Sequence, residues 1–348
     1  MKIKQIKRVL RILFIIASLS SLTLVPWILV KAWILPLPDT VQEQLNDVID
    51  YGFDGMVVYV DEAGKPPAFY AAGWKDRKNK IPADPHALFK IASITKLYVA
   101  VAATKLVKAN RLSLDKTLAD YFPELIGRIE YADAITLRMM LQHRSGIPNY
   151  TDHTDYWVDP PMDRKVKLSY ALDLPASFKP DRGYEYSNTN YMLISDLIDK
   201  VLGYPHQQYI KEEILLPLNL HNTYGSLYEV DLDDVMSGYY VGIDEDIKTD
   251  YSGLMIATAE DVGIFLRALN DGSVFNDGEQ EIYSSVYVYD HGGLLPGYQS
   301  LAKYHKDADM VVVQFMNTTN FDGYHWNLSQ IFYNRIVKII NKTNKLNP

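Results

Sequence analysis

Strand-like and helix-like patterns are unevenly distributed along this chain of 348 residues, and their order constrains the fold more than any other feature. Short apolar runs rich in Val, Tyr and Phe predict strands near both ends, at residues 55–60, 68–72, 282–289, 298–304 and 310–315. Helical spacing dominates residues 113–227 and recurs elsewhere, with helices expected at residues 39–49, 97–107, 191–202, 206–215, 261–269 and 326–340. The simplest fold with this order is α+β: an antiparallel sheet built from both termini and flanked by helices, with an all-helical part inserted between.

The N-terminal segment differs in composition from the rest. Its first 31 residues carry six basic side chains and no acidic one, and residues 12–30 contain no charge. This run is long enough for a membrane-spanning helix, and the basic flank before it predicts that the following chain lies outside the cytoplasm. A cleaved signal peptide is the alternative. We therefore expect an anchor or signal at residues 1–35, a folded domain at residues 39–340, and a helical subdomain within it at about 110–230.

Composition excludes several classes of site. The residues after position 31 carry 29 basic and 43 acidic side chains, a net charge of −14, which argues against nucleic acid as a partner. The chain has no cysteine, which excludes disulfides, cysteine nucleophiles, thiolate metal sites and a lipid-modified cysteine. Its eight histidines form no H-x-x-x-H or H-x-H pair, so no metal is expected.

Ser93 and Lys96 stand where the helix expected at residues 97–107 begins. Backbone N–H groups at a helix start have no partner within the helix, so they can stabilise an oxyanion. Lys96 follows Ser93 by three residues and falls on the same helical face. Burial would lower the pKa of such a lysine, and a neutral lysine can take the serine proton. The pattern suits an activated nucleophile, and an N-cap serine is an equal alternative.

Two other S-x-x-K strings begin at Ser113 and Ser300. Ser113 lies in a polar turn, where a serine more often caps a helix than reacts. Ser300 lies in an expected strand, where residues three apart point to opposite faces. Only Ser93 combines the spacing with a helix start.

Two further stretches carry candidate site residues. Tyr186 and Asn188 lie in a polar loop before a helix, where a tyrosine near a lysine can transfer protons and an asparagine can orient the lysine or bind a substrate carbonyl. His291, Gly293 and Leu294 lie in a glycine-rich stretch, where a backbone N–H could be a second oxyanion donor. The alternatives are a turn with a buried tyrosine and a glycine-rich hairpin with an exposed histidine.

Taken together and in this order, S-x-x-K, Tyr-x-Asn and His-x-Gly resemble the motifs of the serine penicillin-binding proteins and class C β-lactamases, with the related D-Ala-D-Ala carboxypeptidases and esterases. Similar stretches occur at residues 141–148, 252–261 and 291–298, so the resemblance runs from about residue 40 to 340. It implies the β-lactamase/transpeptidase fold and an enzyme that needs no cofactor and no metal.

The resemblance also implies roles for the site residues. Ser93 would become acylated, Lys96 and Tyr186 would share proton transfer, and Asn188 would position Lys96 and the substrate amide. The N–H groups of Ser93 and Leu294 would form the oxyanion hole, with Gly293 lining the substrate site. Which of Lys96 and Tyr186 is the base stays open, because such a pair titrates as a unit.

The third motif departs from the Lys-Thr-Gly of these families. Lysine and a hydroxyl there bind the free carboxylate of a D-Ala terminus or a β-lactam. His291 is expected to be only partly charged near neutral pH, and Gly292 has no hydroxyl. Ester substrates without that carboxylate therefore become more plausible. The stretch between residues 269 and 291 is also short, which leaves room for one strand fewer than in the usual sheet.

The resemblance implies a membrane-anchored serine hydrolase outside the cytoplasm that acts on D-alanyl groups of the cell envelope. D-Ala-D-Ala carboxypeptidase and D-alanyl esterase are near-equal alternatives, and an efficient β-lactamase is less expected. A catalytically silent penicillin-binding-like sensor is the alternative from another class. The expected partners are a peptidoglycan peptide or a D-alanylated polymer, and the membrane through residues 12–30.

Overall fold

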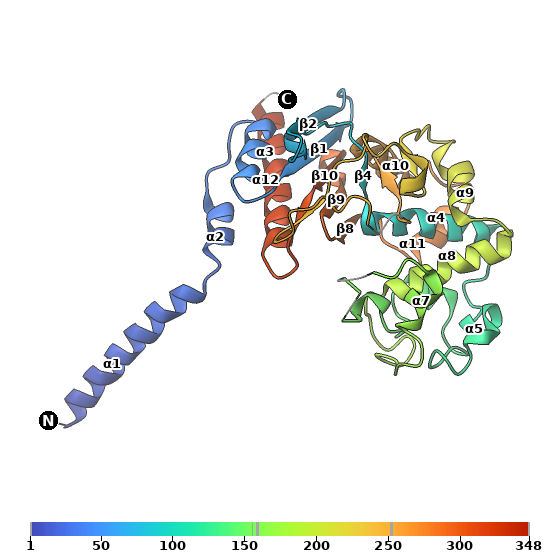
Figure 1. The fold of residues 1–348 in the computed structure, drawn as a ribbon, viewed down its shortest axis with the longest axis horizontal. Helices are drawn as coiled ribbons and strands as arrows, with labels where there is room; N and C mark the ends of the chain where they lie inside the picture. The colour runs from blue at the N-terminus through green and yellow to red at the C-terminus, as the bar shows by residue number, and fades with distance from the viewer. Residues whose placement is uncertain (1, 155, 158–159, 251–252, 347–348) are drawn as a thin grey trace.

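The computed structural model describes residues 2–154, 156–157, 160–250 and 253–346. Its centre is a six-stranded antiparallel sheet in the order β3-β2-β1-β10-β9-β8 (Figure 1). Strands from the two ends of the chain are neighbours, since β1 pairs with β10 from Met56↔Met316 to Glu62↔Met310. The α+β prediction is confirmed. The strands of this sheet are β1 (Gly55–Glu62), β2 (Ala68–Asp76), β3 (Ile81–Pro82), β8 (His291–Leu295), β9 (Tyr298–His305) and β10 (Met310–Met316).

Helices cover both faces of the sheet and form a lobe beside it (Figure 1). The longer predicted helices are confirmed, with ends that shift by a few residues. The α-helices of the described chain are α1 (Lys2–Ser21), α2 (Trp27–Ile34), α3 (Val41–Ile49), α4 (Thr95–Lys108), α5 (Leu118–Tyr121), α6 (Leu137–Leu141), α7 (Arg164–Ser169), α8 (Asn188–Leu202), α9 (His206–Ile210), α10 (Ala259–Asp271), α11 (Glu279–Ser284) and α12 (His325–Leu346). Short strands outside the main sheet are β4 (Phe89–Lys90), β5 (Thr223–Tyr224), β6 (Tyr239–Tyr240), β7 (Ile256–Ala257) and β11 (Thr318–Thr319).

Alternate side chains of the central strands enter two apolar cores. Val57 and Tyr59 of β1 belong to the core that includes side chains of α4 and α10. Met56, Val58 and Val60 belong to the core that includes side chains of α3 and α12. This is the consequence of the two-residue period of a strand when both faces of its sheet are covered.

The strand expected at residues 282–289 is wrong. Helix α11 covers Glu279–Ser284, and its buried side chains Glu279 and Tyr283 are followed by buried Val286. That spacing of four and then three residues is helical, although aromatic and β-branched residues gave the segment a strand-like composition. The glycine-rich stretch that follows forms a strand instead, β8, at the edge of the sheet.

Residues 12–30 do not form the single helix expected for a membrane span. Helix α1 ends at Ser21, a 3-10 turn follows, and α2 begins at Trp27 directly after Pro26. Proline has no N–H for a helix interior, so it begins α2 and does not continue α1. Among the described residues, no helix is both long and apolar enough to cross a membrane.

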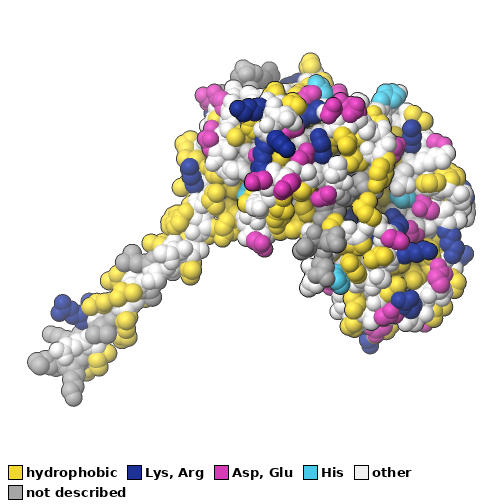
Figure 2. All heavy atoms as spheres, viewed as in Figure 1, with side chains coloured by type: hydrophobic (Ala, Val, Ile, Leu, Met, Phe, Trp, Pro, Cys, Tyr) yellow, Lys and Arg dark blue, Asp and Glu magenta, His cyan; other side chains and the backbone are white. Residues whose placement is uncertain are grey.

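The two N-terminal helices have different surroundings. Helix α1 extends away from the body with apolar side chains along its surface (Figure 2), including Ile6, Leu10 and Phe14. Helix α2 packs on the body instead. Arg335 of α12 donates to the carbonyl oxygens of Ala32 at 3.3 Å, Leu35 at 2.7 Å and Pro36 at 2.8 Å. Helix α2 is therefore held by the folded part of the chain.

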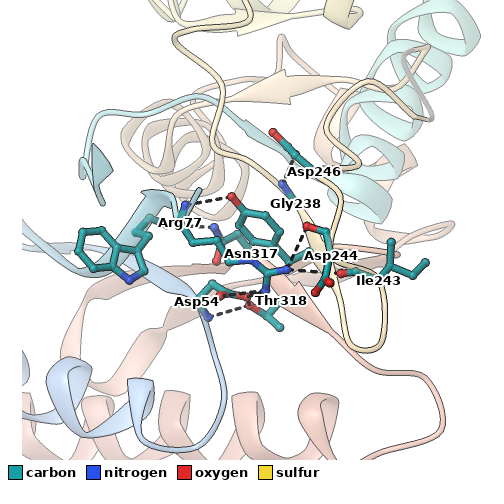
Figure 3. A network of polar contacts seen from close by, with 10 residues as sticks. Asp54, Arg77, Gly238, Ile243, Asp244, Asp246, Asn317 and Thr318 are labelled. Carbon is teal, nitrogen blue, oxygen red and sulfur yellow. Dashed lines mark hydrogen bonds and ion pairs between the residues drawn. The ribbon is translucent and has the colours of Figure 1, made fainter. Parts of the chain in front are cut away.

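A polar network ties the loop after β6 to the rim of the sheet (Figure 3). The Arg77 guanidinium donates to both carboxylate oxygens of Asp54 at 3.2 Å. Its other terminal nitrogen donates to the carbonyls of Ile243 at 3.4 Å and Asp244 at 3.3 Å. Thr318 also donates to Asp54, at 2.8 Å. This ion pair and the hydrogen bonds around it thus join segments from the start, middle and end of the chain.

Candidate active site

Ser93 lies in a 3-10 turn, Ala92–Ile94, that leads directly into α4. Strand β4 precedes the turn and pairs with β7, which fixes how the chain enters it. Ala92 has a φ of 51°, in the left-handed region that residues other than glycine rarely adopt. Ser93 is half-buried between the buried residues Ala92 and Ile94. A strained residue next to a reactive group is a common feature of active sites.

Lys96 is buried at the start of α4 and connects Ser93 to α8. Its Nζ donates to Ser93 Oγ at 3.2 Å and to Asn188 Oδ1 at 2.7 Å. The Asn188 amide is oriented by its nitrogen, which donates to Thr151 Oγ1 at 3.1 Å and to Asn149 Oδ1 at 3.3 Å. The amide oxygen therefore faces Lys96 and holds its Nζ beside the serine.

Tyr186 reaches the serine from the loop before α8. Its hydroxyl donates to Ser93 Oγ at 2.7 Å, and its ring centroid lies 4.9 Å from Lys96 Nζ. Ser93 Oγ is thus within hydrogen-bond distance of two titratable groups. Whichever of them is unprotonated can accept the serine proton, and the pair can then return a proton to a leaving group.

The turn at residues 141–148 supports Tyr186. The ring of His143 lies 4.5 Å from the ring of Tyr186, and its Nδ1 accepts a hydrogen bond from the Ser187 N–H at 3.2 Å. Burial lowers the pKa of His143 to about 3, with the charge of Lys96 as the next cause, so the ring is a neutral acceptor. The sequence of residues 141–148 resembles the corresponding stretch of the families named above. Only the contacts of His143 show that it supports Tyr186.

His291 lies at the start of β8 with both ring nitrogens engaged. Nδ1 donates to the Gly292 carbonyl at 2.5 Å, and Nε2 accepts from the hydroxyl of Tyr287 at 3.0 Å. Burial lowers the pKa of His291 to about 4, and the charge of Lys96 contributes. The expectation of a partly charged histidine is therefore wrong, because a buried imidazole beside a cation stays neutral at pH 7. The sequence did not point to Tyr287, because residues 282–289 were expected to form a strand.

Strand β8 also brings backbone groups to the serine. Leu295 lies opposite Tyr298 at the end of the β8–β9 hairpin, and alternate N–H groups of an antiparallel strand point away from its partner. The Leu294 N–H therefore points away from β9. A Cβ on Gly293 would lie 2.5 Å from the Ile91 carbonyl oxygen and 2.8 Å from the Ala92 Cβ. This close approach brings Leu294 to the turn that carries Ser93, as a two-donor oxyanion site requires.

These groups line one cavity of about 720 Å³, which includes Ser93, Lys96, Tyr186, Asn188, His291 and Leu294. The other two S-x-x-K serines are not among its described lining. Ser300 is buried in β9 and donates to the Ile91 carbonyl at 3.2 Å, and Ser113 lies in a turn. No cluster of three or more His, Asp or Glu side chains in the described ranges could hold a metal ion.

The comparison of sequences identifies the family. Residues 37–328 match the family described as Beta-lactamase. This chain belongs to the Beta-lactamase family. It is therefore a serine hydrolase of the β-lactamase and penicillin-binding protein superfamily, and the resemblance seen in the sequence is confirmed.

Similar proteins match this chain over different lengths. The PbpX protein of Bacillus subtilis (strain 168), whose name places it among penicillin-binding proteins, is 25% identical over 326 residues, 87% of this chain and 79% of PbpX. Protein flp of Staphylococcus aureus (strain MW2) is 26% identical over 190 residues, and the match covers 52% of this chain and only 38% of flp. The crystal structure of D-amino acid amidase from Ochrobactrum anthropi SV3 with L-phenylalanine has a TM-score of 0.77 at 21% identity, covering 87% of this chain and 99% of the amidase. That similarity confirms the β-lactamase/transpeptidase fold.

Proposed function

We propose that Ser93 is the nucleophile of this hydrolase and that its substrates are D-alanyl esters of the cell envelope. The proposed preference for esters rests on the charge and the hydrogen bonds of His291. Its ring is neutral and both nitrogens bind protein groups, so it offers no cation to a substrate carboxylate next to the scissile bond. An ester without that carboxylate loses nothing there, and an alkoxide leaves more easily than an amide nitrogen. The name of the structurally similar D-amino acid amidase supports a D-configured acyl group.

The proposed reaction uses only side chains and backbone of this chain. Ser93 Oγ attacks the ester carbonyl while its proton passes to the pair of Lys96 and Tyr186. The carbonyl oxygen becomes an oxyanion that accepts from the N–H groups of Ser93 and Leu294. The pair returns the proton to the departing alkoxide, and the acyl group stays on Ser93. Water then adds by the same route and releases D-alanine and the free serine.

A D-Ala-D-Ala carboxypeptidase is the second candidate. It is favoured by the cations of the cavity wall, Lys96, Arg164 and Lys167, which would attract the terminal carboxylate of such a peptide. The two candidates differ in which bond acylates the serine faster. Intact-mass spectrometry with a D-alanyl ester, a D-Ala-D-Ala peptide and a penicillin decides between them. Faster acylation by the ester supports the first candidate, and faster acylation by the peptide or penicillin contradicts it.

Ser93→Ala is the test of the nucleophile. We expect this variant to fold and to lose acylation by several powers of ten, because no other group in the cavity replaces the serine. Ser113→Ala is the matched control, since it removes the serine of a second S-x-x-K string, and we expect it to keep full activity. A Ser93→Ala protein with more than about a tenth of the activity would exclude Ser93 as the nucleophile.

We also propose that the N-terminal segment holds the enzyme at the outer surface of a membrane. The support is the run of exposed apolar side chains on α1, including Ile3, Leu13 and Phe14, beside basic residues that favour anionic lipid. The measurement is flotation with phosphatidylglycerol vesicles. The full chain should float with the vesicles and a chain beginning at Trp27 should not. A full chain that stays unbound would refute the attachment.

A further inference from the structure

The cavity that contains Ser93 has a one-sided charge distribution. Its described lining includes three cations, Lys96, Arg164 and Lys167, and no Asp or Glu side chain. The whole chain, in contrast, has a net charge of −8. A cleft lined by one sign of charge focuses the electric field and attracts ligands of the opposite sign. The lining therefore favours a substrate that carries a negative charge.

Two of the three cations are already engaged. Lys96 binds Ser93 and Asn188 at 3.2 and 2.7 Å. Arg164 forms an ion pair with Asp196 at 2.5 Å and donates to the Met192 carbonyl at 2.7 Å. These contacts hold the two groups in place and satisfy most of their charge.

Lys167 is different because its ammonium has no hydrogen bond or ion pair with any residue that the structure describes. The side chain is half-buried in the cavity wall. Burial lowers the pKa of Lys167, and the neighbouring charge of Arg164 lowers it further. A partly desolvated cation beside another cation is unfavourable until an anion pairs with it. Among the described residues of this wall, Lys167 is thus the cation without a counterpart.

The position of Lys167 separates it from the reacting atoms. It follows Arg164 by three residues on α7, so the two side chains share a helical face. Arg164 is fixed to Met192, which follows Asn188 by four residues, about 6 Å along the axis of α8. The two α7 cations therefore lie further along the cavity from Ser93 than Asn188 does.

We propose that Lys167, supported by Arg164, forms a subsite for an anionic group of the substrate, a phosphate or a carboxylate, several bonds away from the ester that Ser93 attacks. The inference rests on the proposed function for the identity of the reacting serine. With His291 neutral at the edge strand, the cavity selects a substrate that is uncharged beside the scissile bond and negative further along.

The test uses three N-acetyl-D-alanyl esters, so that the amine carries no charge. Their alcohols are glycerol, glycerol phosphate and 4-hydroxybutyrate, which supply no anion, a phosphate and a carboxylate, and both anions lie several bonds from the ester. We expect Lys167→Met to lower kcat/KM about tenfold for an anionic ester and to leave the glycerol ester unchanged. Lys167→Arg should keep the preference for an anionic ester over the glycerol ester. Lys165→Met is the matched control, because it removes the same charge from α7 at an exposed position outside the described cavity lining.

The outcomes distinguish this subsite from the proposed function. The anionic ester that loses most in Lys167→Met identifies phosphate or carboxylate as the ligand. The subsite is overturned if the wild type has the same kcat/KM for all three esters, or if Lys167→Met lowers kcat/KM equally for all three. Either result leaves the esterase proposal standing. If no ester acylates Ser93, the esterase proposal fails. Calorimetry on Ser93→Ala protein then still decides the subsite: tighter binding of an anionic ester that Lys167→Met abolishes supports it, and equal binding overturns it.

Discussion

Ser93 Oγ has two proton-transfer neighbours, Lys96 at 3.2 Å and Tyr186 at 2.7 Å. We expect Lys96→Ala and Tyr186→Phe each to slow acylation strongly, and the double variant to be little slower than the slower single one. Groups that act as one unit are not additive, because removing either one already stops the transfer. The measurement is the acylation rate with the D-alanyl ester followed by intact mass. Fully additive losses would show that the two groups act in separate steps.

A second feature at the scale of residues is the tight space around Gly293, which leaves no room for a side chain. A Cβ at this position would lie 2.4 Å from Ser300 Oγ and 2.5 Å from the Ile91 carbonyl oxygen, so β8 must move away from the Ser93 turn. We expect Gly293→Ala to destabilise the protein by about 1–3 kcal/mol and to slow acylation through the displaced Leu294 N–H. Gly253→Ala, whose Cβ would meet no described atom within 4 Å, is the control for stability in urea unfolding. Unchanged acylation in Gly293→Ala would argue against Leu294 as an oxyanion donor.

At the scale of elements, α2 belongs energetically to the body. Arg335 is only 6% exposed, and its guanidinium is satisfied by the carbonyls of Ala32, Leu35 and Pro36 and by the side chain of Gln44. A chain beginning at Asp39 leaves most of these donors unpaired, which we expect to cost about 2–4 kcal/mol relative to a chain beginning at Trp27.

Urea unfolding of both chains, with and without Arg335→Met, measures this cost. The substitution should destabilise the longer chain much more than the shorter one, since the shorter chain has already lost the partners of Arg335. Equal effects in the two chains would show that α2 contributes nothing through this arginine.

For the whole molecule, the buried histidines predict a loss of stability in acid. The pKa of His143 is lowered to about 3 and that of His291 to about 4, whereas an unfolded histidine titrates near 6.5. Below about pH 6.5 the unfolded chain binds these protons first. The contribution of these two rings to stability is therefore complete above that pH and falls by up to about 2.7 kcal/mol per pH unit toward pH 4. The lowered pKa values of His305 and His325 act in the same direction. Asp196 and Asp261, whose pKa values are raised by burial, oppose this fall, because the folded protein binds a proton at each before the unfolded chain does.

Urea unfolding at about pH 7.5 and pH 5.5 measures the fall. His291→Gln should show a shallower pH dependence than the wild type, because one of the titrating histidines is gone. Equal stability of the wild type at both pH values would contradict the assignment of neutral, buried rings.

What the sequence determined by itself is local. The helix period places Lys96 one turn after Ser93, and the apolar runs identify β1, β9 and β10, because spacing along one element is a property of the chain alone. The tertiary structure decided which distant groups meet. It brings Tyr186 and Asn188 to the serine, makes residues 279–284 a helix that contacts α4, and docks α2 on α12. It also decides the charge of His291, since burial and a neighbouring cation exist only after packing, and no spacing of residues encodes them.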